Sequence, residues 1–459
     1  MSSLIASERG KDLLLFEHFT YTRDKVLKSG ENSWRCTQKM LKCKARVYTV
    51  GPNNLVSRNY GVHNHGTDEQ KLNRKIVTNA CKRKAKEDIS ERPSKIICKS
   101  LATNLPTTLT TTDVSYIRKN IYNCRQKVLP GPLPKNMEGV HEAVGNYCES
   151  RLTSKGEDFL FINDPETNII VFTCKSNISV LTEVNVLYMD GTFSFCTKFF
   201  SQFFTIHGLQ NGHYVPLVFC LLPSKTVQAY RSCFALIKCN ISEKYGLTLK
   251  PKKIFVDFEK AIHTALLCVW PSVEINGCRF HLHQSWYRKI QSIGLTSEYK
   301  SKTEIGNWLQ NTFGLAHLSP NEVEDCFIFD LMSCKPQNEN LDKYCDYLLE
   351  TYIVENALFP PSLWAEEIAS TTRTTNCCES FHAKFNNSFY STHPSIYIFL
   401  EKLQECQIDT YVKLQSLHIP MKVKDKTVKN KLEALQSLVN KYRLGEIDRI
   451  HYVKCTSYL

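Results

Sequence analysis

Two carboxylates each follow a short apolar run that is typical of a buried β-strand. Asp190 ends the run 186–189 (Val-Leu-Tyr-Met), and Asp257 ends the run 254–256 (Ile-Phe-Val). Either aspartate alone could simply cap a following helix or turn. Two of them in one strand–helix region predict carboxylates at strand ends of a single α/β sheet, where such folds build their sites.

Glu379 is the third acid that we expect at this site. It lies in a mixed segment with Thr, Asn, Cys, Phe and His, and on a helix it would share one face with His382. Such a helix could be capped by Thr374, Thr375 or Asn376. Glu366 and Glu367 are competitors, but they follow Pro360-Pro361 and are typical of an exposed helix start, where acids favour the positive dipole end.

Three shared carboxylates suit the chemistry of phosphodiester cleavage and strand transfer. Those reactions use two divalent ions about 3.5–4 Å apart, one activating the attacking oxygen and one stabilising the leaving oxygen. Mg²⁺, with Mn²⁺ as its substitute, is the natural ion for a site made only of oxygen ligands. The sequence therefore predicts Asp190, Asp257 and Glu379 as catalytic residues and magnesium ligands.

Two cysteines and two histidines near the N-terminus have the composition of a structural zinc site. Cys36 and Cys43 are separated by six residues, which would fit neighbouring strands of a hairpin. His63 and His65 are two residues apart, so on a strand they would face the same side. Two thiolates and two imidazoles complete a tetrahedral Zn²⁺ site.

The positive charge of the chain is concentrated in its first third. The net charge is +13, and residues 1–140 hold 26 Lys and Arg against 12 Asp and Glu. Such an excess favours binding to a polyanion, with duplex DNA as the expected partner. The densest cluster is Lys82, Arg83, Lys84 and Lys86, which we assign to DNA binding. A nuclear import signal and a merely solvated face are the alternatives for this cluster.

Hydrophobic periodicity divides the chain into four segments. Short alternating runs predict a small sheet in 8–66, and helical patterns predict three helices in 67–130, either a helix-turn-helix or a plain helical linker. Alternating strands and helices predict an α/β domain with a mixed sheet in 158–393, interrupted by a helical insertion at about 296–358. Residues 394–459 are expected to form a helical tail.

Nothing in the sequence indicates export or a membrane. No apolar run approaches the length of about 18 residues that a membrane helix needs. The apolar stretch at 12–16 is too short and wrongly flanked for a secretory signal. We therefore expect an intracellular, reduced protein whose 20 cysteines are free thiols or metal ligands.

The stretch from Leu14 to His65 resembles a FLYWCH zinc finger. The resemblance rests on Leu14 or Leu15, Phe16, Tyr21, Trp34, Cys36 and His63. It implies that Cys36, Cys43, His63 and His65 bind zinc, with Trp34 packed on the site, and that the module contacts DNA or partner proteins.

A second resemblance covers about residues 165–390. Asp190, Asp257 and Glu379, with Cys278-x₂-His281 between the second Asp and the Glu, resemble the transposase domain of Mutator-like (MULE) elements. The resemblance implies an RNase H-like fold in which the three acids hold the catalytic metals. Cys278 and His281 are expected to have a structural or DNA-positioning role. A second Cys/His-rich finger, which many members carry after the catalytic domain, is not found in 391–459.

These observations together predict a nuclear, metal-dependent DNA transposase with zinc-finger DNA binding. A domesticated descendant that regulates transcription without catalysis is the main alternative. A zinc-stabilised protein-interaction module without DNA affinity is a third interpretation, which the basic first third disfavours. The sequence leaves self-association open.

Overall fold

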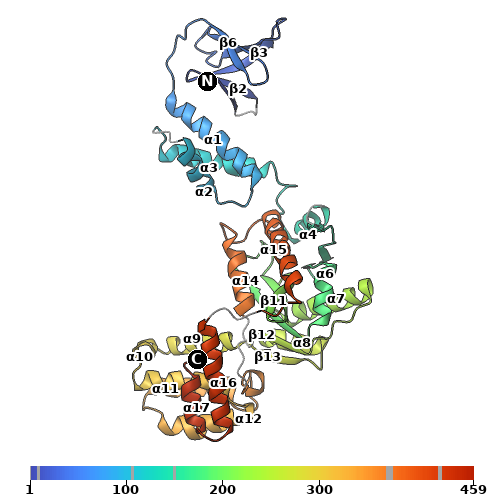
Figure 1. Cartoon of the computed structure of the whole chain (residues 1–459), viewed down its shortest axis with the longest axis vertical. Coiled ribbons are helices and arrows are strands. Elements are labelled where there is room, and N and C mark those ends of the chain that lie inside the picture. The colour runs from blue at the N-terminus through green and yellow to red at the C-terminus, as the bar shows by residue number, and fades with distance from the viewer. Residues whose placement is uncertain (1, 8–10, 105–107, 148–150, 368–375, 422–425) are drawn as a thin grey trace. The chain divides into compact units, whose positions relative to one another are not determined.

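The computed structural model describes residues 2–7, 11–104, 108–147, 151–367, 376–421 and 426–459. They form two compact units, Met1–Pro132 and Leu133–Leu459, and each unit is considered by itself (Figure 1). No helix in the described ranges is long and apolar enough to cross a membrane.

The first unit begins with a six-stranded antiparallel sheet in which each strand pairs with the next along the chain. Its strands are β1 (Ser3–Ala6), β2 (Asp12–Phe16), β3 (Phe19–Val26), β4 (Asn32–Cys36), β5 (Arg46–Val50) and β6 (Leu55–Tyr60). Its apolar core is a small cluster of buried side chains, formed by Leu14, Tyr21, Trp34, Cys36, Cys43, Ala45 and Val47. A core of this size supplies little hydrophobic stabilisation, and such modules usually need a metal or a disulfide.

Three helices follow the sheet: α1 (Glu69–Glu87), α2 (Pro93–Asn104) and α3 (Thr111–Gln126). Each packs against the other two through a shared apolar core that includes Val77, Ile96 and Ile117. Thr110 and Asp113 form a capping box that starts α3, which satisfies backbone donors of its first turn. The segment therefore has a core of its own and is not an unpacked linker.

The second unit is built around a seven-stranded mixed sheet with the order β13-β12-β9-β10-β11-β8-β7. Its strands are β7 (Leu160–Asp164), β8 (Ile169–Phe172), β9 (Val186–Thr192), β10 (Gln202–Gln210), β11 (His213–Leu222), β12 (Lys253–Val256) and β13 (Glu274–Gly277). Strands β9 to β11 are antiparallel neighbours, whereas β12 and β13 run parallel to β9.

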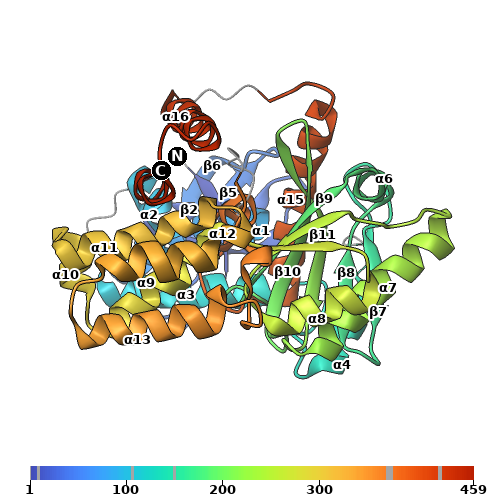
Figure 2. The ribbon, with the colours of Figure 1, turned by 90° about the horizontal axis from the view of Figure 1, so that it is seen from below.

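Helices cover both faces of this sheet, so the central strand β10 is buried over most of its length (Figure 2). On one face Phe204 belongs to a core shared with α6 (Lys175–Glu183), α7 (Val227–Tyr245) and α8 (Lys260–Val269). On the other face the Phe203 ring contacts Phe385 of α14 (Asn376–Asn387) and Phe399 of α15 (Ile396–Ser416). Adjacent residues on a strand point to opposite faces, which explains this division.

A second, all-helical core adjoins the sheet through α9 (Arg279–Ser292), which follows β13 directly. Its other members are α10 (Thr296–Ser301), α11 (Glu304–Thr312), η1 (Phe313–His317), α12 (Pro320–Asp325), η2 (Cys326–Leu331), α13 (Glu339–Leu348), η4 (Leu349–Ile353), α16 (Lys426–Arg443) and α17 (Arg449–Thr456). The expected C-terminal tail is thus divided, because α15 lies on the sheet while α16 and α17 complete the helical core. Helix α4 (Met137–Asn146) packs near β7.

The close contact between η1 and α17 predicts that one added methyl group would lower the stability of the fold. A Cβ on Gly314 would lie 2.0 Å from the carbonyl oxygen of Val453, so Gly314→Ala must displace backbone. We expect a decrease of about 1–3 kcal/mol in unfolding free energy, measured by urea unfolding of the full chain. Gly145→Ala is the control, because its Cβ would meet Asn163 at an ordinary 3.5 Å and a helical Ala is favoured over Gly. Equal unfolding midpoints for the two variants would contradict this packing.

Candidate active site and zinc centre

The register between β9 and β12 brings two of the predicted acids together. The two strands are parallel, with Ile254 opposite Leu187 and Phe255 opposite Tyr188. Continuing the same register by two residues sets Asp257 level with Asp190. The side chain of Asp190 is 12 % exposed and that of Asp257 is 50 % exposed.

Helix α14 lies beside β9 and contributes the third acid. Glu379, His382 and Asn386 recur at helical spacing on one face of α14, and all three line the same pocket as the two aspartates. His382 Nδ1 is 3.1 Å from Asp190 Oδ2, and its Nε2 is 2.9 Å from the Thr205 hydroxyl. His382 thereby joins the helix to two strands of the sheet and fixes the orientation of the Asp190 carboxylate.

His281 of α9 lies between the other two acids. Its Nδ1 is 3.5 Å from Asp257 Oδ1 and its Nε2 is 3.0 Å from Glu379 Oε1. Both contacts are within ion-pair distance but do not have the geometry of a hydrogen bond. His281 Nδ1 and Glu379 Oε1 are buried, and neither atom has a hydrogen-bond partner in the described part of the chain. Burial opposes the charged imidazolium, but contacts with Cys278 and Glu379 and the charge of Asp257 outweigh it and raise the pKa of His281 to about 11.

These side chains line a pocket of about 520 Å³. Four acids and two cations contribute to it: Asp190, Asp257, Glu259, Glu379, Lys225 and Arg288. Burial raises the pKa of Glu259, and the negative charge of Asp257 adds a smaller increase. The positive charge of Lys225 and a hydrogen bond with Tyr230 oppose this shift. The three predicted acids share the pocket, but among the described residues they do not form a cluster whose ligand atoms all lie within 4.8 Å of one another.

The N-terminal sheet holds a cluster that meets this distance criterion. One donor atom from each of Cys36, Cys43, His63 and His65 lies within 4.8 Å of the other three. Cys36 Sγ is 3.3 Å from His65 Nε2, and Cys43 Sγ is 3.4 Å from His63 Nδ1. Two thiols and two imidazole nitrogens around one point are the ligand set of a closed structural zinc site.

Both histidines are held in place by their second ring nitrogen. His63 Nε2 is 2.8 Å from the Tyr21 hydroxyl, and its ring stacks on Phe19 at a centroid distance of 3.5 Å. His65 Nδ1 is 3.0 Å from the carbonyl oxygen of Gly66. Such partners select the tautomer and the ring orientation of a metal-binding histidine.

Two family models match parts of the chain. The model of the MULE transposase domain matches residues 186–285, and the model of the FLYWCH zinc finger domain matches residues 4–65. The chain carries both domains. None of the curated proteins that were compared with the chain matches it.

The FLYWCH domain and the Cys/His cluster together support a structural zinc ion. The strand positions expected for its ligands are wrong in detail, because Cys36 ends β4 whereas Cys43 lies in the connection to β5 and both histidines follow β6. The ligands therefore converge through loops next to a sheet, and not through paired strand faces. Trp34 lies in the same buried cluster as the two cysteines, and its indole N–H donates to the Thr49 hydroxyl at 2.9 Å.

The MULE match contains Asp190, Asp257, Cys278 and His281, but it ends before Glu379. Glu379 is thus supported by its position in the pocket alone. Its competitors lie elsewhere: Glu366 Oε1 is 3.7 Å from Lys253 Nζ, and Glu367 Oε1 is 2.9 Å from Arg443 Nε. Of the caps expected for this helix, Thr374 and Thr375 lie outside the described residues, and the side chain of Asn376 is not described.

Asp257 does not cap the following helix. The residue before α8 is Glu259, and it makes no side-chain cap hydrogen bond. Asp257 Oδ1 instead accepts a hydrogen bond from the Phe258 N–H at 2.7 Å. Cys278 is fully buried at the start of α9, where its N–H donates to the Val256 carbonyl oxygen at 2.8 Å.

Three charged residues of the pocket were missed from the sequence: Lys225, Glu259 and Arg288. Lys225 and Arg288 lie on separate elements that only folding brings together, so no spacing in the sequence reveals them. Glu259 offered a signal, since it stands two residues after Asp257 in the same strand-to-helix turn. The basic cluster falls within the last turns of α1, where Arg83 and Lys86 are exposed and Lys82 and Lys84 are half-buried.

The zinc cluster predicts a specific loss of metal. Cys43→Ser in the full chain should reduce bound zinc from about one equivalent to near zero, because one of four ligands in a closed site is removed. Elemental analysis of the purified protein measures this. Cys268→Ser is the matched control, since Cys268 is an exposed cysteine outside the cluster. Equal zinc content in both variants would disprove the ligand assignment.

Proposed function

We propose that the chain is a metal-dependent DNA transposase that hydrolyses a phosphodiester and joins the resulting 3′ end to target DNA. The observation that carries the proposal is that Asp190, Asp257 and Glu379, from three separate elements, line one pocket. Two of these acids, Asp190 and Asp257, lie in the MULE transposase domain, and this supports a role of the pocket in DNA transposition.

An RNase H-like fold for this domain is part of the proposal. Three consecutive antiparallel strands, β9, β10 and β11, are extended on the β9 side by the parallel strands β12 and β13. Helices lie on both faces of this arrangement. The interior position of β9 favours it, because Asp190 then lies on the strand next to β12, which Asp257 follows directly.

The residues of the pocket fit a divalent metal of the Mg²⁺ or Mn²⁺ type. The three acids line one pocket and offer only carboxylate oxygens, the ligands that Mg²⁺ prefers in proteins. Asp190, Asp257 and Glu379 would hold the metal. Bound there, it would activate the attacking oxygen and stabilise the leaving oxygen.

The remaining side chains of the pocket have roles that do not depend on coordinating a metal. Lys225 and Arg288 supply positive charge at its wall and would hold the phosphate of the scissile bond. His382 orients Asp190 through the 3.1 Å contact. His281 lies at ion-pair distance from both Asp257 and Glu379 and would orient the two carboxylates.

The DNA would be held by the FLYWCH domain and by the basic helices in the first unit. Lys82, Arg83, Lys84 and Lys86 lie close together near the end of α1, and phosphate neutralisation is the expected source of affinity. A protein that acts on chromosomal DNA is expected in the nucleus, which completes the proposal.

One observation favours the alternative, a DNA-binding regulator that no longer cleaves. His281 already contacts both Asp257 and Glu379, in the space between two of the proposed metal ligands. In a regulator this ion-pair arrangement would replace the metal permanently. The cleavage measurement below separates the two functions.

Removing any one acid should abolish cleavage. We expect Asp190→Asn, Asp257→Asn and Glu379→Gln each to lower Mg²⁺-dependent cleavage of a labelled duplex about 100-fold or more, because each loses charge that stabilises the transition state. Binding of the duplex should be unchanged. Glu366→Gln is the matched control, since this acid lies 3.7 Å from Lys253 and does not line the pocket.

An unmodified chain that binds duplex but never cleaves it would support the regulator. Cleavage that survives in Glu379→Gln would remove Glu379 from the site.

The basic cluster should contribute equally to the affinity for all DNA sequences. Replacing Lys82, Arg83, Lys84 and Lys86 with Gln should weaken duplex binding and flatten its salt dependence, by about 0.9 in log–log slope for each phosphate that is no longer neutralised. Fluorescence anisotropy over a salt series measures this. A control removes the same charge from exposed positions of α16: Lys426, Lys429, Lys431 and Lys441. An unchanged slope in the first variant would mean that this cluster does not touch DNA.

A further inference from the structure

Residues 66–185 match neither family model, yet they contain the three-helix module of the first unit. The outer face of its third helix, α3, has an unusual composition. Its exposed residues include Ser115, Arg118, Lys119, Tyr122 and Asn123. The one acid of α3, Asp113, is 2 % exposed and faces inward.

We propose that this outer face of α3 enters the major groove of duplex DNA and reads base edges there. The inference rests on the proposed DNA function and names the element that gives it sequence preference. An α-helix with its side chains is about 10–12 Å wide, and the major groove is about 12 Å wide. Arginine, lysine, asparagine and serine are the side chains that pair with base edges in that groove.

The charges of this face are free to meet a polyanion. Among the described residues, neither Arg118 nor Lys119 lies within ion-pair distance of a carboxylate, whereas Lys99 of α2 lies 2.6 Å from Glu91. The face therefore offers two unneutralised cations beside neutral hydrogen-bonding groups. This favours a polyanion with readable edges over an apolar or acid-bearing helix of a partner protein.

Contacts at both ends hold α3 in one rotation about its axis. At its start, Asp113 accepts from Arg74 at 3.0 Å and from Gln70 at 2.8 Å, both on α1. At its end, the buried Arg125 donates to the carbonyl oxygens of Asp88 and Glu91 at 3.0 and 2.5 Å. Ile117 and Ile121 bury the inner face between these anchors. A helix face that recognises base edges needs such support, because base recognition tolerates little misalignment.

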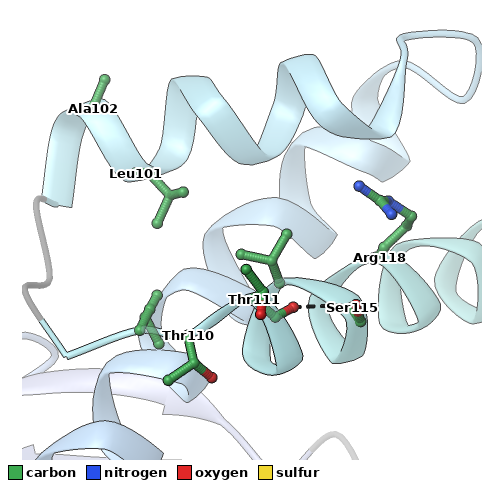
Figure 3. A pocket seen from close by; sticks show the side chains of 8 residues that line it. Leu101, Ala102, Thr110, Thr111, Ser115 and Arg118 are labelled. Atoms are coloured by element: carbon green, nitrogen blue, oxygen red, sulfur yellow. Dashed lines mark hydrogen bonds between the residues drawn. The ribbon is translucent and has the colours of Figure 1, made fainter.

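The flank of the face is also free of acids. A pocket of about 550 Å³ opens between the end of α2 and the first turns of α3, and Arg118 and Ser115 lie on its α3 wall (Figure 3). The remaining lining is apolar or carries hydroxyls: Leu101, Ala102, Leu109, Thr110, Thr111 and Val114. A DNA strand beside α3 would thus meet no carboxylate from this wall.

The test uses the full chain and a library of random-sequence duplexes, from which bound molecules are recovered and sequenced. The unmodified chain should enrich a defined motif. Asn123→Ala, which leaves the charge unchanged, should reduce the preference for that motif over a scrambled duplex about 10-fold. Arg118→Gln should do the same and also weaken binding overall.

Lys99→Gln is the matched control for charge, because it removes one cation from the same module outside the α3 face. It should keep the motif and the preference, and thermal unfolding should show all variants folded. Enrichment of the same motif with equal preference by Asn123→Ala and Arg118→Gln overturns the inference. So does an unmodified chain that prefers RNA or single-stranded DNA, or that binds duplexes without a motif. A chain with no nucleic-acid affinity refutes the proposed function itself.

Discussion

The parallel pairing of β12 with β9 is the constraint on which the candidate active site depends. Continued by two residues, its register sets Asp257, which follows β12, level with Asp190 within β9. A slip of one residue would turn every side chain of β12 to the other face and bury a carboxylate in the apolar core. The register is held by Ile254 and Val256, both fully buried, so the hydrophobic core of the domain also determines the separation of the two acids.

The two units achieve their stability in different ways. The second unit has two large cores and fully buried aromatic residues such as Trp286 and Tyr230. The N-terminal sheet buries only a small cluster, and two of its buried side chains are the cysteines of the metal site. Metal binding and folding are therefore expected to be coupled in the sheet and independent in the second unit. A structural ion near the N-terminus and a catalytic ion in the pocket would serve separate purposes.

Features that depend on residues close together in the sequence could be predicted from the sequence. The apolar run 254–256 lies in β12, and Asp257 follows this strand directly, as expected, whereas β9 continues to Thr192, two residues beyond Asp190. Contacts over long sequence separations were not predictable in this way. His281 meets Glu379 across almost one hundred residues, and nothing in the sequence around either residue points to the other. The division of the C-terminal segment between two cores has the same cause, because similar amphipathic helices can pack on either core.

The central claim is that Asp190, Asp257 and Glu379 form one metal site, and a crystal structure of the full chain grown with Mn²⁺ tests it directly. Anomalous scattering locates the metal without reference to activity. Two peaks about 3.5–4 Å apart, bound by these three carboxylates with His281 moved out from between Asp257 and Glu379, are the predicted result. A pocket with no manganese, in which His281 still contacts both acids, would contradict the claim.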